Sequence, residues 1–188
     1  VPSWMPIAGA AVLLFGFLAW AAAGSTLQVP GLLTGTIALS VPLIFGAMGG
    51  VISERGGVIN IAIEGQLLAG AFVSAVVGSI TGIPLAGLVA AAVAGMLVSF
   101  ILATFAIRYL VNQVIVGVVI NVLISGLTGF LFSKWLSEDS STFNSPDRFE
   151  TIAIPLLSEI PLIGPALFRQ TVIVYLMYVI VALVAYGL

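Results

Sequence analysis

Long apolar runs dominate the chain, and its few charged residues fall almost entirely between them. The first charged residues are Glu54 and Arg55, and only Glu64 interrupts the apolar sequence from there to Arg108. Runs of about 20 apolar residues fit between these marks, which is the length of an α-helix that crosses a bilayer. The pattern predicts six transmembrane helices, near residues 4–23, 34–52, 57–79, 84–107, 111–132 and 171–188. We therefore expect an all-α, polytopic helical bundle.

Proline and glycine refine these limits. The pair Pro30-Gly31 and the stretch 81–84 are turn signals between predicted helices. Pro42 lies inside the second helix and is expected to kink or break it. The sequence starts at Val1 without an initiator methionine and stops at Leu188 inside an apolar run. We therefore expect residues 1–188 to form a single transmembrane domain that is truncated at both ends.

The longest polar stretch, residues 133–170, separates the fifth and sixth predicted helices. Arg55 and Arg108 stand in short links that fall on one side if every helix spans, and short basic links favour the cytoplasm. The loop 133–170 is therefore expected on the extracytoplasmic side. Its apolar, proline-broken part fits either an element lying on the membrane surface or an ordered loop packed on the bundle. Its charged residues are Lys134, Glu138, Asp139, Asp147, Arg148, Glu150, Glu159 and Arg169.

Composition excludes several classes of protein. The chain is 61% hydrophobic and 6% charged, whereas soluble domains are about 25% charged. It has no cysteine and no histidine, which removes thiolate metal sites, disulfides and the commonest general base. It also lacks a glycine–lysine phosphate loop, and a net charge of −2 gives no reason to expect nucleic acid. We expect no catalytic residue, metal or cofactor on this chain, so transport or conduction remains.

Small residues recur at intervals of four and predict close helix packing, which drives helix association in lipid. In the second helix Gly46 and Gly50 form one such pair. In the fourth helix the stripe drifts about 40° per step, so it should wind around a neighbour. The members of this stripe are Gly87, Ala91, Gly95, Ser99 and Ala103.

The fifth helix carries a polar stripe instead. Amides are unfavourable in lipid unless they are hydrogen-bonded or hydrated. The stripe therefore indicates either a partly hydrated path lined by protein or hydrogen bonding between helices. It consists of Gln113, Gly117, Asn121 and Ser125, followed by Thr128.

Glu64 is the least expected residue, because a carboxylate in lipid costs roughly 2.5–3.5 kcal/mol. Asn60 precedes it by four residues and should share its helix face. If Gly56-Gly57 is a break, Glu64 lies near a helix start, where the helix dipole favours a carboxylate. Three roles stay open: an acid near the interface that is partly hydrated or paired with Arg55, a residue lining a translocation path, or a proton-coupling acid.

One segment resembles a known family. Residues 49–72, "GGVISERGGVINIAIEGQLLAGAF", are similar to a segment of ABC importer permeases of the branched-chain amino acid, ribose and nucleoside group. The segments 40–50 and 112–132 also fit, so the resemblance covers at least residues 34–132. The matching motif residues are Glu54, Arg55, Gly57, Val58, Asn60, Ile61, Glu64 and Gly65.

The resemblance implies a permease domain that works as a pair, either of identical copies or with a close relative. It also implies cytoplasmic ATPase subunits, which would hold the ATP, and an extracytoplasmic solute-binding protein in a bacterial plasma (inner) membrane. Nucleosides or simple sugars would be imported; a branched-chain amino acid importer and an ion-coupled secondary transporter are the alternatives. The loop that would contact the ATPase after the sixth helix is missing from the sequence. The expected substrate path is lined by Asn60, Glu64, Gln113, Asn121 and Ser125.

Overall fold

The computed structural model describes residues 4–21, 29–161 and 163–187. Its long helices confirm the all-α, polytopic class. They are α1 (Trp4–Ala21), α2 (Val29–Arg55), α3 (Ile63–Thr81), α4 (Pro84–Ala103), α5 (Gln113–Leu131) and α8 (Val172–Gly187). Short π-helical turns, η1 (Thr104–Arg108) and η2 (Phe132–Leu136), continue α4 and α5.

Of the six predicted spans, four are long and apolar enough to cross a membrane in the part of the chain that the structure describes. These are Val29–Arg55, Ile63–Thr81, Pro84–Arg108 and Gln113–Leu136. The first and last predicted spans are shorter apolar helices, within Gly9–Trp20 and Val172–Gly187.

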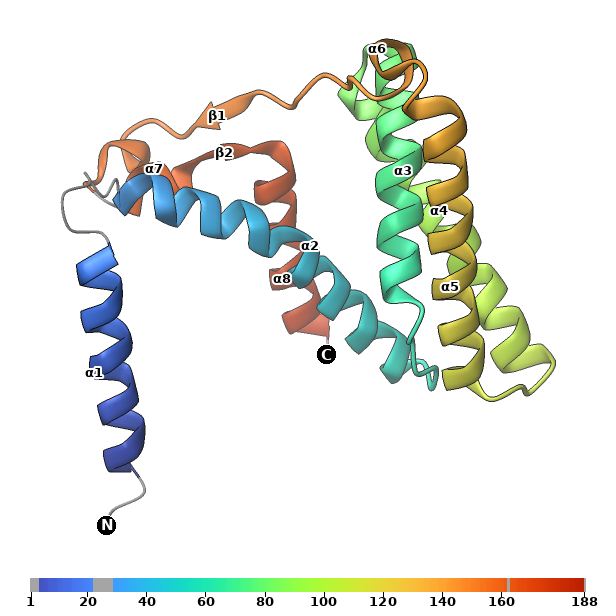
Figure 1. Cartoon of the computed structure of the whole chain (residues 1–188), viewed down its shortest axis with the longest axis horizontal. Helices are drawn as coiled ribbons and strands as arrows, with labels where there is room; N and C mark the ends of the chain where they lie inside the picture. Colours follow the sequence, from blue (N-terminus) through green and yellow to red (C-terminus); the bar gives the residue numbers. More distant parts are fainter. Residues whose placement is uncertain (1–3, 22–28, 162, 188) are drawn as a thin grey trace.

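The helices form two packed groups (Figure 1). Helices α3, α4 and α5 stand side by side, while α2 packs against α8 and the short helix α7 (Ile163–Phe168). Each group has its own apolar core: Ala62, Ala69, Val98, Leu102, Val116 and Ile120 in the first, and Val41, Val174 and Met177 in the second. Helix α1 stands apart from both (Figure 1), and its described side chains at 9–20 are all exposed.

Helix α2 begins earlier than the turn signal at Pro30-Gly31 predicts. It starts at Val29, which places Pro30 in the first turn, where its missing N–H leaves no helical hydrogen bond unmade. Pro42 lies at the midpoint of the 27-residue helix. The ribbon of α2 stays continuous and changes direction near its middle (Figure 1), as expected of a kink rather than a break.

The small-residue stripes lie in tight helix contacts over part of their length. A Cβ on Gly87 of α4 would lie 2.9 Å from the carbonyl oxygen of Ser74 on α3, whereas one on Gly95 would meet nothing within 4 Å. A Cβ on Gly46 of α2 would lie 3.2 Å from Cγ2 of Ile63. The glycines therefore bring α4 and α2 close to α3, and the stripe of α4 leaves the contact before its end.

The described part of the connection from α5 to α8 contacts the helices near its two ends, through α6 (Ser140–Phe143) on α3 and α7 on α2. Its elements are α6, β1 (Thr151–Ala153), η3 (Leu157–Glu159), α7 and β2 (Arg169–Thr171). The strands β1 and β2 pair antiparallel; this small sheet was not predicted. The amide of Ser145 donates to Oγ of Ser79 on α3 at 2.9 Å, and the hydroxyl of Tyr175 on α8 donates to the carbonyl of Ile152 at 2.9 Å.

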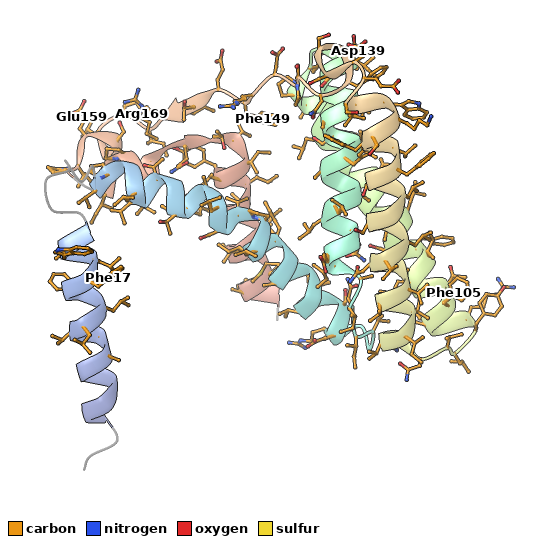
Figure 2. The ribbon with its side chains drawn as sticks, in the orientation of Figure 1. Phe17, Phe105, Asp139, Phe149, Glu159 and Arg169 are labelled. Atoms are coloured by element: carbon orange, nitrogen blue, oxygen red, sulfur yellow. The ribbon has the colours of Figure 1, made fainter. Side chains whose placement is uncertain are left out.

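The charged residues of this connection lie at the opposite end of the bundle from the short charged links. Figure 2 shows Asp139, Glu159 and Arg169 along its upper edge. The end of α2 at Arg55 and the start of α5 lie together at the lower end of the α3–α5 group (Figure 1). The predicted separation of short links from the long loop is therefore present in the fold.

Candidate functional site

Between α2 and α3 the chain leaves the helix for residues 56–62, which we call the link. Helix α2 ends with the amide of Gly57 donating to the carbonyl of Glu54 at 2.9 Å and that of Val58 donating to Ser53 at 3.0 Å. This pair of bonds is a Schellman motif, which needs a left-handed residue at the position of Gly57. Gly57 has a φ of 81°, a conformation that glycine adopts more readily than any residue with a Cβ. This explains why a glycine occupies this position of the motif.

The link corrects the prediction of a helix over 57–79, because α3 starts only at Ile63. Asn60 therefore precedes the helix, and its expected position on one helix face with Glu64 is wrong. Its Oδ1 accepts from the amide of Ala62 at 3.1 Å, and its Nδ2 donates to Oε1 of Gln66 at 3.1 Å. Asn60 thus turns the link into α3 and ties it to the first turns of that helix.

Helix α5 holds the link through its polar stripe. At one end, Oε1 of Gln113 accepts from the amide of Ile59 at 2.6 Å, and its Nε2 donates to the carbonyl of Gly57 at 3.4 Å. About 12 Å further along the helix axis, Nδ2 of Asn121 donates to the carbonyl of Ile61 at 2.9 Å. Its Oδ1 accepts from the amide of Gly65 at 2.8 Å. Asn121 therefore caps one of the free N–H groups at the start of α3 from a neighbouring helix.

Gly117 lies between these two amides, where the link approaches α5 most closely. A Cβ at this position would lie 2.6 Å from Cβ of Ile61 and 3.2 Å from the amide nitrogen of Ala62. Ala62 is fully buried. Stripe residues spaced four apart thus contact the link over about two turns of α5. Their amides form hydrogen bonds with backbone groups that would be unpaired in lipid.

Glu64 lies in the first turn of α3, as expected if the break falls at Gly56-Gly57. Its exposed side chain lines a hollow of about 450 Å³, which we call the acidic hollow. Among the described residues that line this hollow, none forms a hydrogen bond or an ion pair with its carboxylate. The lining residues are Glu64, Asn121, Val122, Ser125 and Gly126.

A second hollow of about 400 Å³ adjoins the first and shares Ser125 with it. We call it the aromatic hollow, because Phe72 of α3 and Phe132, the first residue of η2, line it. The hydroxyl of Thr128 also lines it but donates to the carbonyl of Ile124 at 2.7 Å. Its lining residues are Leu68, Phe72, Ala75, Ser125, Thr128, Gly129, Phe132, Leu136 and Asn144.

The fold therefore divides the predicted path residues into two sets. Glu64, Asn121 and Ser125 share the acidic hollow. Asn60 lies in the link and Gln113 holds the link from α5, and neither of them lines the acidic hollow. Among the motif residues, Glu54 and Arg55 are exposed at the end of α2. Gly65 is buried beneath Asn121, whose Oδ1 would lie 2.9 Å from a Cβ there.

The amino-acid sequence did not indicate the two phenylalanines of the aromatic hollow, Phe72 and Phe132. Phe72 follows Glu64 by eight residues and Leu68 by four, which places all three on one face of α3. Phe132 follows Ser125 by seven residues, which is about two turns of α5. The spacing of these residues along α3 and α5 places them near the polar residues. In a chain that is 61% hydrophobic, however, this spacing does not distinguish an aromatic residue that lines a hollow from one that faces lipid.

Comparison with known proteins gives consistent results. The family model described as "Branched-chain amino acid transport system / permease component" matches residues 32–187. The guanosine ABC transporter permease protein NupQ of Bacillus subtilis is 36% identical over 141 residues, covering 72% of this chain and 44% of the relative. The nucleoside ABC transporter permease protein NupC of Lactococcus lactis is 32% identical over 169 residues, covering 86% and 52%.

A third relative is named for glucose transport. The putative glucose ABC transporter permease protein TsgC13 of Haloferax volcanii is 36% identical over 146 residues, covering 78% of this chain and 44% of the relative. The chain thus spans about half the length of the curated relatives it matches. No solved structure matches it.

Proposed function

The chain belongs to the family of permease components of branched-chain amino acid transport systems, and from this premise we propose that it forms part of an ATP-driven importer of nucleosides or simple sugars. Two similar proteins are named for guanosine and nucleoside transport, and a third for glucose transport. A permease component is not itself an enzyme. ATP hydrolysis is proposed to take place on separate cytoplasmic subunits, which would hold the ATP.

The observation that carries this proposal is that α5 holds the link in place and that Glu64, just after the link, lines the acidic hollow. Irregular backbone within a membrane protein is tolerated only where it packs against protein or lines a water-filled cavity, and transporter binding sites are often built beside such segments. Here the irregular link between α2 and α3 is held by Gln113 and Asn121, and the first turn of α3 presents Glu64 beside Ser125. Carboxylate and hydroxyl oxygens suit neutral, hydroxyl-rich solutes, which need hydrogen bonds rather than counter-charges.

The proposed partners follow from the family and from the two ends of the bundle. A second permease subunit, identical or closely related, would complete the path. The end with Arg55 and Arg108 is proposed to face the cytoplasm and the ATPase subunits, in agreement with the positive-inside rule. The connection with Asp139 would face an extracytoplasmic solute-binding protein, with the permease in the plasma (inner) membrane.

One observation favours a second candidate, an ion-coupled secondary transporter. Glu64 carries the only charge in its helix, and a carboxylate that faces a hollow within the membrane is a group that can take up and release a proton. Against it, no other acidic residue occurs between Arg55 and Arg108 to pass a proton on. The two candidates differ in their energy source, which an uptake experiment separates.

The test is uptake of labelled uridine, ribose and leucine by cells that carry the intact gene with its neighbouring genes. We expect uptake of uridine or ribose to stop when ATP is depleted and to continue when ionophores collapse the ion gradients. Uptake that follows the ion gradient would refute the ATP-driven reading and favour proton coupling at Glu64. ATP-dependent uptake of leucine alone would support an importer but refute nucleosides and simple sugars as its substrates.

A further inference from the structure

We propose that the groove between α3 and α5 binds a nucleoside, with its base against Phe72 and Phe132 and its ribose hydroxyls at Glu64 and Ser125. This inference rests on the proposed function and narrows it from nucleosides or simple sugars to nucleosides. It also gives the substrate a direction in the groove, with the ribose towards the link and the base towards the connection that carries Asp139.

The acidic and aromatic hollows adjoin at Ser125, which lines both, and we call the two together the groove. Along α3, the step from Glu64 to Phe72 rises about 12 Å in two turns, with Leu68 between them. Along α5, Phe132 lies about two turns beyond Ser125. Both helices therefore pass from polar to aromatic lining in the same direction, and the two rings come from opposite walls of the groove.

The carboxylate and hydroxyl groups that are free to bind the hydroxyls of a solute lie at one end of the groove. Asn121 already uses its donor on Ile61 and its acceptor on Gly65, and the hydroxyl of Thr128 is bound to Ile124. Among the described lining residues, this leaves the carboxylate of Glu64 and the hydroxyl of Ser125 at the polar end, and the side-chain amide of Asn144 at the far end of the aromatic hollow. A carboxylate accepts from two hydroxyls at once, as neighbouring hydroxyls of a ribose present them.

The other end offers flat carbon surfaces. Phe72 is half-buried and Phe132 is 46% exposed, so both rings have a face that a planar ligand can cover. Base–aromatic stacking contributes about 1–3 kcal/mol per base and tolerates any base, since every base has a π-face. A nucleoside matches this order of polar and aromatic surfaces, whereas a simple sugar would leave the aromatic hollow unfilled.

The same lining disfavours a zwitterionic amino acid. The described residues of the two hollows include no lysine or arginine, so the carboxylate of leucine would lack a counter-charge. It would also meet the carboxylate of Glu64. A lipid chain or another apolar helix could fill the aromatic hollow, but neither would use the polar end, which is continuous with it.

The experiment measures ATP-dependent uptake by the intact importer carrying Phe72→Leu or Phe132→Leu. We expect each change to raise the uridine concentration for half-maximal uptake roughly five- to hundredfold, at equal permease content of the membrane. Phe72→Tyr, which keeps the ring, should behave as the unaltered protein. Phe130→Leu is the matched control, because this phenylalanine of α5 is 61% exposed and does not line either hollow.

Three results would overturn the inference. Unchanged uridine uptake by Phe72→Leu and Phe132→Leu would assign the aromatic hollow to lipid or to another helix. Loss of uptake in Phe72→Tyr would show a packing role rather than stacking. ATP-dependent uptake of ribose without any uptake of uridine by the unaltered importer would refute the nucleoside while the proposed function stands. Absence of ATP-dependent uptake altogether would instead refute the proposed function itself.

Discussion

At Gly117, helix α5 touches the link so closely that a side chain has no room. A Cβ would lie 2.6 Å from Cβ of Ile61, and overpacking of this kind costs about 1–3 kcal/mol. We expect Gly117→Ala to lower the thermal stability of the purified intact permease in detergent. Gly129→Ala on the same helix is the control, since its Cβ would meet nothing within 4 Å and alanine favours the helix. Equal melting temperatures for the two variants would contradict the close approach.

Asn121 is the second residue on which the geometry of the link depends. Asn121→Leu would leave the carbonyl of Ile61 and the amide of Gly65 without their partners, and an unsatisfied buried polar group costs about 1–3 kcal/mol. We expect this variant to lose uptake while remaining in the membrane, because the apolar spans still insert. Asn121→Asp keeps the acceptor for Gly65 and should retain part of the activity.

Uptake and immunodetection in isolated membranes check both parts of this prediction. Val119→Leu provides the control, because Val119 is 59% exposed on the same helix. Normal uptake by Asn121→Leu would show that the hydrogen bonds of Asn121 are dispensable for transport.

At the scale of the element, the short helix α6 depends on its cap. Oδ1 of Asp139 accepts from the hydroxyl of Ser141 at 2.8 Å and from the amide of Thr142 at 3.2 Å. Hydrogen bonds from Thr142 and Ser141 lower the pKa of Asp139 below its ordinary value of 3.8. Because the folded pKa is the lower one, the stabilisation is complete above the unfolded value and is lost as the pH falls through the folded pKa.

We therefore expect α6 to lose its protection in acid, below about pH 4. Hydrogen exchange of the segment around 140–145, corrected for the intrinsic rate at each pH, would measure this in the intact permease. Asp139→Asn should abolish the acid-dependent step, whereas Asp147→Asn in the same connection should leave it in place. A step that persists in Asp139→Asn would assign it to another group.

The elements also show what the sequence could predict and what it could not. Long apolar runs predicted the helices, because the length needed to cross a bilayer leaves few alternatives. The start of α3 was misplaced because Val58, Ile59 and Ile61 continue the apolar pattern through the link. Hydropathy alone does not distinguish an apolar irregular segment from a helix. The glycine pair Gly56-Gly57 was the local sequence signal of the break, and Gly57 adopts the left-handed conformation there.

The sequence predicted the polar stripe of α5, but it could not predict which groups the stripe binds. Gln113 and Asn121 bind backbone groups of the link, and backbone groups leave no trace in the amino-acid pattern. For this reason the sequence left a hydrated path and structural hydrogen bonding as alternatives. The fold shows the amides holding the link, while Glu64 and Ser125 remain open to the groove.

At the scale of the whole molecule, the two ends of the bundle give a prediction about sidedness. These 188 residues contain no cysteine, so a thiol introduced among them reports its own position once any cysteine elsewhere in the intact permease has been replaced by serine. We expect Asp139→Cys to react with a membrane-impermeant thiol reagent in intact cells, and Arg108→Cys to react only after permeabilisation. The opposite pattern would invert the proposed orientation and place the connection from α5 to α8 in the cytoplasm.

The central claim is that the link, held by α5, presents Glu64 to the solute of an ATP-driven importer. The most direct measurement is ATP-dependent uridine uptake by the intact importer with Glu64→Leu, compared with Glu138→Leu in the connection. Hydrogen bonds to a charged group contribute about 1.5–3 kcal/mol, so we predict a fall in uptake of roughly ten- to hundredfold for Glu64→Leu and none for Glu138→Leu. Uptake by Glu64→Leu at the level of the unaltered importer would contradict the claim and leave Glu64 outside the path.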